Sequence, residues 1–465
     1  MSGLFNALQI GKSSLGASQK GIEVTGGNLA NVNTPGYSRQ TAQVSSYPTL
    51  NMGGFLVGQG VRVDDVTRAH NSFLTRQIDS QSAALGQESA KAVPLADLER
   101  IANISETGLG GRIDGFFDAW KELSNDPASS AARDGVLQGG EMLATAFNQA
   151  ADELEGVRRG IDDTLEGKID AINGQLQEVA DLNLRISSLQ AAGQSAPADR
   201  DRRDQLLESL SSSLGIQHFD AGSGMVAVHL PGGLPPLVQE GEALALEANR
   251  SGDALQLQLK AGDRVHDLGV DNLGGEAGGL LEVRDQVLPG VQNDLDKLAY
   301  SLATGVNAVH AAGTDPSGAA GGAFFAVPAA PAPPADPWEG AAGSLATALS
   351  DTGQVAAGTS SASGDNTNAL AMMALEDAPS VDGSTSFGRF YADMASRVGT
   401  EVSQNQLSLQ GSGDALLQLQ NFRDAQVGVS VEEEMVSLIQ FQKGFEASAK
   451  FLATVDEMMD SLLNI

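Results

Sequence analysis

The stretch NLANVNTPGYSRQ, residues 28–40, decides how this chain folds, because it ends one helical pattern abruptly and starts another kind of structure. Proline fixes its own φ and glycine adopts backbone conformations that other residues avoid, so Asn33-Thr34-Pro35-Gly36 predicts a turn. We expect this turn to set the angle between the first helix and the rest of the protein; a simple surface turn is the alternative. The residues expected to act as the hinge are Asn31, Asn33, Pro35, Gly36 and Tyr37.

The residues before this turn follow a heptad pattern. One column, spaced by seven, is apolar and consists of Leu8, Leu15, Ile22 and Leu29. The neighbouring column is mostly small or polar and consists of Leu4, Gly11, Ser18 and Thr25. This pattern is typical of a coiled-coil seam with one apolar and one small edge, where small residues let a second backbone come close.

The other end of the chain, SVEEEMVSLIQFQKGFEASAKFLATVDEMMDSLLNI at 430–465, carries a matching pattern. Ser430 and Glu433 have capping-box spacing, and the acidic run Glu432–Glu434 suits the solvated start of a helix. We expect the two terminal helices to pair with each other and also to pack against other molecules; an ordinary pair that only closes the domain is the alternative. The expected assembly interface comprises Leu4, Leu8, Leu15, Ile22, Leu29, Leu438, Phe445, Leu452, Met459 and Leu462.

Between the ends, the periodicity changes twice, which predicts a mainly α protein with a smaller β insertion. Short alternating segments between Gly and Pro residues indicate an antiparallel β domain, and aromatic residues at 116–123 have the helical spacing of a core face. Pro94 predicts a helix start or a kink. The predicted units are a terminal coiled-coil core layer (1–60 and 430–465), a helical rod domain (61–214 and 274–429, with an Ala/Pro-rich loop at 328–363) and an outer antiparallel β domain (215–273).

Composition argues against several classes of function. The chain has 28 Lys and Arg residues against 59 Asp and Glu residues, a net charge of −31, which disfavours binding to nucleic acid or anionic membranes. It has no cysteine, so disulfides and thiolate metal sites are excluded. The N-terminus lacks a signal-peptide pattern, and no apolar run approaches the roughly 18 residues that would predict membrane insertion.

Motifs for catalysis are not recognisable in the sequence. The segment Gly11-Lys12-Ser13 lacks the glycine and the preceding strand of a phosphate-binding loop. None of the five histidines has the spacing of a metal ligand. We therefore expect no enzyme activity, no catalytic residues, no cofactor and no metal. The histidines are His70, His218, His229, His266 and His310.

The stretch NLANVNTPGY at 28–37 resembles the signature of the bacterial flagellar axial proteins, which form the rod, the hook and the hook-associated parts of the flagellum. The continuation YSRQ at 37–40 and the segments 116–154 and 364–375 resemble the hook-associated members. The resemblance covers roughly the first 210 and the last 190 residues. The hook protein or another rod-type subunit is the alternative within the family, and a secreted enzyme or adhesin with a ligand-binding β insertion is the alternative outside it.

This resemblance implies a structural protein that joins hook to filament and assembles through its N- and C-terminal helices. It implies export through the flagellar secretion channel without a cleaved signal peptide, and an extracellular location at the hook–filament junction. The implied partners are the flagellar hook protein, the next hook-associated protein, copies of the chain itself, and a cytosolic export chaperone that covers the C-terminal helix.

Overall fold

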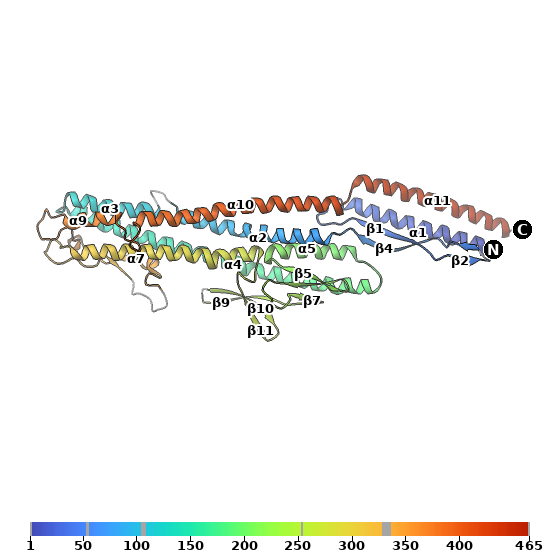
Figure 1. Ribbon diagram of the computed structural model, residues 1–465, viewed down its shortest axis with the longest axis horizontal. Helices are drawn as coiled ribbons and strands as arrows, with labels where there is room; N and C mark the ends of the chain where they lie inside the picture. Colours follow the sequence, from blue (N-terminus) through green and yellow to red (C-terminus); the bar gives the residue numbers. More distant parts are fainter. Residues whose placement is uncertain (1, 53–54, 104–107, 253, 328–335, 464–465) are drawn as a thin grey trace.

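The protein is elongated, and its two termini lie at the same end (Figure 1). The computed structural model describes residues 2–52, 55–103, 108–252, 254–327 and 336–463. Long helices run along most of the length, and a small β region projects from one side of the rod. The structure is thus mainly helical with small antiparallel sheets, as the sequence predicted.

One end is formed by the two terminal helices and a β hairpin between them in sequence. Helix α1 (Ser2–Ala30) packs antiparallel to helix α11 (Val431–Leu463), more than 400 residues away. Strands β1 (Gln40–Ser46) and β4 (Val61–Arg68) pair antiparallel beside α1, and β2 (Leu50–Met52) pairs with β3 (Phe55–Val57). Strand β4, which lies beyond the expected boundary at residue 60, therefore accompanies the terminal helices.

The rod is a bundle of long helices. Helix α4 alone has 62 residues; Ser129 caps it by accepting a hydrogen bond from Ala132 N, and its buried stripe repeats with helical spacing. A π-helical turn, η1 (Val283–Val287), joins α6 to α7. The helices are α2 (Ser72–Ile101), α3 (Leu109–Asn125), α4 (Ser130–Ala191), α5 (Pro197–Leu214), α6 (Gly275–Glu282), α7 (Leu288–Ala312), α9 (Thr367–Asp377) and α10 (Phe387–Val427).

Helix α2 continues through Pro94, where a helix start or a kink was predicted. The helical assignment is unbroken from Ser72 to Ile101, and Pro94, Leu95 and Leu98 are all buried against the rod. Burial of this apolar face outweighs the local cost of a proline inside a helix, because tertiary packing routinely overrides intrinsic propensity.

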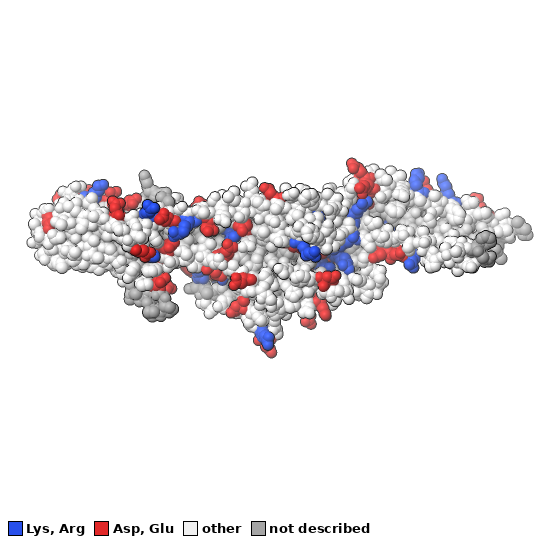
Figure 2. All heavy atoms as spheres, viewed as in Figure 1, with Lys and Arg blue, Asp and Glu red and all other residues white. Residues whose placement is uncertain are grey.

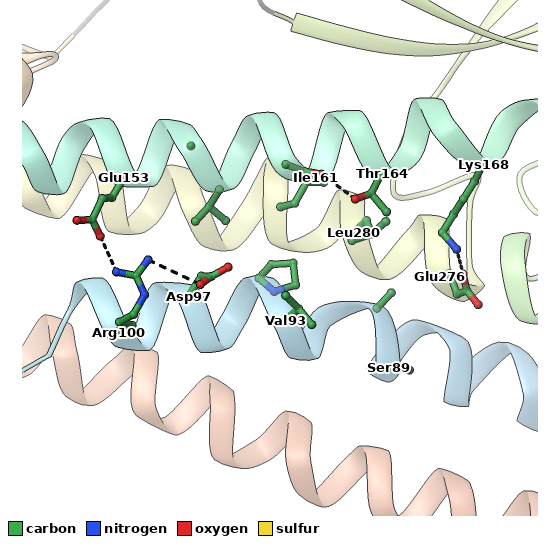
Figure 3. A pocket seen from close by; sticks show the side chains of 15 residues that line it. Ser89, Val93, Asp97, Arg100, Glu153, Ile161, Thr164, Lys168, Glu276 and Leu280 are labelled. Carbon is green, nitrogen blue, oxygen red and sulfur yellow. Dashed lines mark hydrogen bonds and ion pairs between the residues drawn. The ribbon is translucent and has the colours of Figure 1, made fainter.

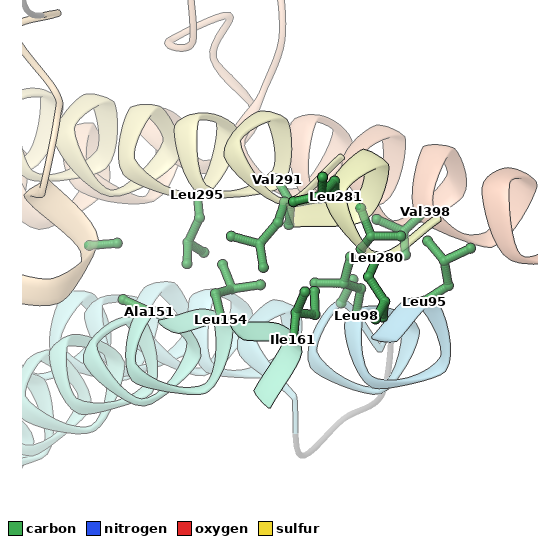
Figure 4. Packing of buried hydrophobic residues seen from close by; sticks show 14 of the residues in the cluster. Leu95, Leu98, Ala151, Leu154, Ile161, Leu280, Leu281, Val291, Leu295 and Val398 are labelled. Carbon is green, nitrogen blue, oxygen red and sulfur yellow. The ribbon is translucent and has the colours of Figure 1, made fainter. Parts of the chain in front are cut away.

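The hydrophobic core runs along the inside of the rod. Figure 4 shows its middle section, where Leu98, Leu154 and Leu281 interdigitate and are completely buried. At the far end, Phe116 and Trp120 from α3 pack edge-to-face, and Phe324 completes the aromatic cluster. The predicted aromatic core face is confirmed.

The β insertion forms two antiparallel sheets that lie against α4. Asn183 donates to the carbonyls of Val226 and Glu240 (2.8 Å each), and Asn173 donates to the carbonyl of Leu246 (2.9 Å). One sheet has the order β5-β6-β7-β8 and the other β11-β10-β9. The strands are β5 (Gln217–Gly222), β6 (Met225–His229), β7 (Val238–Gln239), β8 (Glu242–Ala243), β9 (Leu246–Ser251), β10 (Ala254–Ala261) and β11 (Arg264–Leu268).

The Ala/Pro-rich segment predicted as a loop is described from residue 336 onward; residues 328–335 lie outside the described residues. The described part packs on the rod through α8 (Ala341–Ser344), η2 (Thr352–Gln354) and β13 (Ala346–Thr347). Strand β13 pairs with β12 (Phe325–Ala326), which precedes the segment. Asp296 of α7 accepts hydrogen bonds from the backbone N–H groups of Gly340 and Ala342, which fixes α8 in place. None of the helices in the described residues is long and apolar enough to cross a bilayer.

Candidate functional site

The candidate functional surface is the pair of terminal helices together with its connection to the rod. Two polar contacts fix the antiparallel register of the pair. The hydroxyl groups of Ser14 and Ser448 lie 2.8 Å apart, and Asn28 Nδ2 donates to Glu434 Oε2 at 3.0 Å. The first helix therefore meets its partner along nearly its whole length.

On α1, the seam of this pair is made of small residues. A Cβ added at Gly21 would lie 2.5 Å from the ring of Phe441, and one added at Gly11 would lie 2.7 Å from Leu452 Cδ2. Ser18 and Thr25 on the same face are buried. The large side chains of the seam come from α11, so α1 supplies a narrow face that lets its partner approach closely.

The apolar column of α1 borders this seam and does not fill it. Successive helical residues point about 100° apart, so columns that start at Gly11 and at Leu8 face different directions. The large members of the α1 interface set are only half-buried, whereas Gly11, Gly21 and Asn28 are buried. These half-buried residues are Leu4, Leu8, Leu15, Ile22 and Leu29.

Helix α11 shows the same division between its buried seam and its open face. Glu434, Ser448 and Val455 are its buried residues. Leu438, Phe445, Leu452 and Met459 are half-buried. Leu462 is 55% exposed, because the antiparallel register carries it past the start of α1. Away from α1, large apolar side chains face solvent: Val431, Met435, Val436, Ile439, Phe451 and Met458.

The turn after α1 contacts the rod directly. Gly36 has φ +74°, the left-handed region that favours glycine, and a Cβ there would lie 2.6 Å from Gln205 Nε2. Gln205 of α5 donates to the Pro35 carbonyl at 2.8 Å. Within the turn, Asn31 Nδ2 donates to the Gly27 carbonyl at 2.9 Å, and Asn33 and Pro35 are exposed.

Asn28 is the centre of the polar network that follows the turn. It is 1% exposed, and its Oδ1 accepts from Tyr37 Oη and from Gln40 N, each at 2.9 Å. Its Nδ2 donates to the Gln40 carbonyl as well as to Glu434. Burial, followed by the nearby carboxylates of Asp201 and Glu434, raises the pKa of Tyr37, so the phenol remains a hydrogen-bond donor.

Arg39 ties the network to α11. Its Nε donates to Glu434 Oε1 at 2.7 Å and its Nη1 donates to Glu433 Oε2 at 2.8 Å. Its backbone N–H donates to the Val427 carbonyl at the end of α10. The prediction of a solvated acidic run is wrong for Glu434, which is 2% exposed, because Asn28 and Arg39 satisfy both of its oxygens.

The rod joins the same network from its other side. Asp201 of α5 accepts from Ser38 N at 3.3 Å and from Arg68 Nη1 at 2.6 Å. Arg68, whose side chain is 9% exposed, also donates to Asp204 at 2.6 Å. Polar contacts, several of them buried, thus connect the terminal pair, the hairpin and the rod. Most of them join residues that are too far apart in sequence for a motif to reveal them.

A groove with a volume of about 690 Å³ lies elsewhere, between α2, α4 and α6 (Figure 3). Ion pairs occupy its two ends: Arg100 with Glu153 at 2.9 Å, and Lys168 with Glu276 at 2.5 Å. Its middle is largely apolar and includes Val93, which is 71% exposed. Carboxylates paired with cations are poor general bases, so this groove does not favour the enzyme alternative.

Three known sequence families match this chain. Residues 95–325 match the family described as flagellar hook-associated protein FlgK helical domain. Residues 8–37 match the family of flagella basal body rod proteins, and residues 425–465 match the C-terminal family of the flagellar basal body rod FlgEFG proteins. The last two matches coincide with the helices that pair in the structure.

Similarity to individual proteins extends over the whole chain. Flagellar hook-associated protein 1 of Bacillus subtilis is 27% identical, and the alignment covers 100% of this chain and 99% of that protein. Flagellar hook-associated protein 1 of Escherichia coli is 25% identical, with complete coverage of both. The flagellar hook junction protein FlgK from Burkholderia pseudomallei has the same fold, with a TM-score of 0.68, 18% identity, and coverage of 76% of this chain and 100% of that one. The chain belongs to the flagellar hook-associated protein 1 family, whose members are structural proteins of the bacterial flagellum.

Proposed function

We propose that this chain is the subunit that joins hook to filament, and that it assembles through α1 and α11. The observation that carries the proposal is the pairing of the two chain ends at one tip of the molecule, with apolar residues left uncovered on both helices. A hook protein or rod subunit is less well supported, because residues 95–325 match the helical domain of the hook-associated family.

The uncovered apolar residues suit contact with other subunits. On α11, Met435, Ile439 and Val436 are 51%, 55% and 67% exposed. Large apolar patches on a protein surface mark interaction sites, and each Å² removed from water contributes about 25 cal/mol. On α1, the half-buried column from Leu8 to Leu29 adds a second strip at the border of the seam, so the pair offers neighbouring subunits apolar surface on both helices.

The turn and its network define how the terminal pair leaves the rod. The left-handed Gly36, the Gln205–Pro35 hydrogen bond and the contacts of Asn28 all restrict the same few residues. In the proposed assembly, Asn31–Tyr37 fix the angle between the inner helices and the rod, so that lateral contacts between rods and axial contacts between terminal helices form together.

The proposed partners are those that the family resemblance implies. The terminal helices contact the hook protein on one side, copies of the chain laterally, and the next hook-associated protein on the other side. The chain reaches this extracellular site through the flagellar secretion channel without losing a signal peptide. Before export, a cytosolic chaperone covers the apolar face of α11, which would otherwise promote aggregation.

Incorporation into isolated hooks tests the assembly proposal. A Met435→Gln and Ile439→Gln double variant changes exposed residues of α11 and should leave the monomer folded, as judged by circular dichroism, while reducing incorporation strongly. The matched control is Leu407→Gln with Leu417→Gln, which removes two similarly exposed apolar residues from α10. Equal incorporation of wild type and the α11 variant would refute the proposed role of this face.

A separate experiment tests the chaperone. Deletion of residues 430–465 should abolish binding of the export chaperone in a pull-down with the purified chaperone, while the rod remains helical. Retained binding would place the chaperone site elsewhere on the chain.

A further inference from the structure

A second pocket, of about 470 Å³, lies close to the junction between the rod and the terminal helices. The start of α2, helix α5 and the β5–β6 hairpin enclose it. Four arginines line it, namely Arg68, Arg76, Arg200 and Arg203, against two aspartates, Asp204 and Asp220. The chain as a whole carries about two acidic residues for each basic one, so this local excess of positive charge is unusual. Figure 2 shows several Lys and Arg side chains gathered near this end of the rod.

The positive charge in the pocket is only partly neutralised. Arg68 is paired with carboxylates, but within the described part of the chain Arg200 donates to neutral oxygens, the Ser195 carbonyl at 2.8 Å and Gln190 Oε1 at 2.9 Å. Arg76 is exposed, and among the described residues it has no hydrogen-bond or ion-pair partner. The guanidinium of Arg76 and the remaining N–H groups of Arg200 can therefore pair with an anion.

A third arginine adds positive charge from the buried wall of the pocket. Arg203 is 4% exposed and donates through Nη1 to Asn183 Oδ1 and to the Gly224 carbonyl, both neutral oxygens. No partner for its Nε–H is present in the described part of the chain. Burial lowers the pKa of Arg203 to about 10, which still leaves it charged at neutral pH. An anion in the pocket would reduce the cost of burying this cation.

The rest of the lining is mixed: four side chains are polar, namely His70, Ser72, Thr75 and His218, and the others are mainly apolar. Leu207 is buried in the wall, and Phe219 of β5 is 56% exposed. An inorganic ion would leave the ring of Phe219 facing water, whereas a carboxylate with a few methylene groups could contact both the arginines and this ring. Arginine pairs well with a carboxylate through two parallel hydrogen bonds.

We propose that this pocket binds a carboxylate carried on a short hydrocarbon stem, with Arg76 and Arg200 as the contacting groups. Two sources share this chemistry: a small organic acid in solution, or an acidic side chain of a neighbouring subunit in the flagellum. The second source rests on the proposed function. Glutarate, in which three methylene groups join two carboxylates, is a suitable probe for both, because either carboxylate can bind with the methylene chain behind it.

Ligand-observed NMR with full-length protein and glutarate tests the binding chemistry. Glutarate should bind saturably, and Arg76→Gln and Arg200→Gln should each weaken binding by about tenfold, as expected for loss of a charge-assisted hydrogen bond. Among the described residues Arg76 has no hydrogen bond or ion pair to lose, so Arg76→Gln should leave the fold intact, and circular dichroism of the variant checks this. The control Arg389→Gln changes a 76% exposed arginine side chain of α10 and should leave binding unchanged. Absence of glutarate binding, equal binding of the neutral glutaramide, or tighter binding of inorganic phosphate would overturn the proposal.

Incorporation of the same variants into hooks then identifies the source. Reduced incorporation of the Arg76→Gln, Arg200→Gln double variant, with glutarate binding lost, assigns the carboxylate to a neighbouring subunit. Normal incorporation with glutarate binding lost assigns it to a soluble acid. A wild-type protein that binds glutarate but never enters hooks would contradict the proposed function and leave the carboxylate site in place.

Discussion

Replacing Gly21 by alanine should loosen the pair of terminal helices. In the middle of a helix, alanine is favoured over glycine by about 1 kcal/mol, so intrinsic propensity alone predicts a more stable α1. The added Cβ would, however, lie 2.5–2.6 Å from three atoms of the Phe441 ring, closer than side-chain carbons approach. The ring, or the whole of α11, must move away.

The magnitude follows from these two opposing effects. Overpacking of this kind costs about 1–3 kcal/mol, and exposing a buried aromatic ring costs a similar amount. Phe441 is half-buried, so we expect the cost to exceed the gain in propensity by about 1–2 kcal/mol. Gly16→Ala and Gly26→Ala are matched controls on the same helix, because a Cβ at either position has no neighbour within 4 Å. They should stabilise α1 by up to about 1 kcal/mol.

Hydrogen exchange of the amides in α1 and α11, followed by mass spectrometry, measures the effect directly. Each 1.4 kcal/mol changes an equilibrium about tenfold, so Gly21→Ala should accelerate exchange in both helices by roughly five- to thirtyfold. The two controls should slow exchange or leave it unchanged. If Gly21→Ala protects the helices as much as Gly16→Ala does, the close approach of α1 to Phe441 is incorrect.

Three further perturbations probe the junction and the rod. Glu434→Gln removes the buried charge that pairs with Arg39 and should lower the stability of the junction by about 1–3 kcal/mol. Hydrogen exchange around residues 28–40 should then be faster, whereas Glu432→Gln, which changes an exposed residue, is the control. Gly36→Ala forces a Cβ into a left-handed conformation and against Gln205, at a cost of about 1–2 kcal/mol; full rescue of filament growth by Pro35→Ala plus Gly36→Val would contradict the hinge proposal. The neutral ring of His310 donates from Nδ1–H to the Gly322 carbonyl and accepts at Nε2 from Ala356 N, and burial lowers its pKa. The contribution of His310 to stability is therefore complete above pH 6.5 and is lost as the pH falls through the lower folded-state pKa. Melting temperatures between pH 7.5 and pH 5 should therefore fall less steeply in His310→Gln than in wild type, and equal slopes would show that His310 does not contribute.

Patterns of short range predicted much of this structure. The seven-residue spacing at both ends indicated two long helices, and the change from helical to alternating periodicity located the β insertion. What the pattern could not show is which column of α1 faces α11. The sequence predicted an apolar edge that includes Leu15 and a small edge beside it. In the structure the small edge faces α11, because only small residues leave room for Phe441 and Leu452.

The polar network at the junction could not be predicted from the sequence, for a different reason. Asn28 and Arg39 were both within the stretch that suggested a turn, yet their partner Glu434 lies about 400 residues away, in an acidic run that also suits a solvated helix start. Nothing local distinguishes a buried glutamate from an exposed one. Similarly, Arg76, Arg200 and Arg203 come together only because α2 and α5 lie beside the same hairpin.

The antiparallel pairing of the first and last helices imposes an order on folding. Closing a loop of this length in a disordered chain would cost about 5 kcal/mol of entropy, which a single helix pair can barely recover. Once the rod has formed, the backbone N–H of Arg39 is bonded to Val427 at the end of α10, and the two helices start from neighbouring points. The terminal helices should therefore pair only after the rod has folded. Unfolding of the rod should then separate the two helices, whereas separating the helices should leave the rod folded.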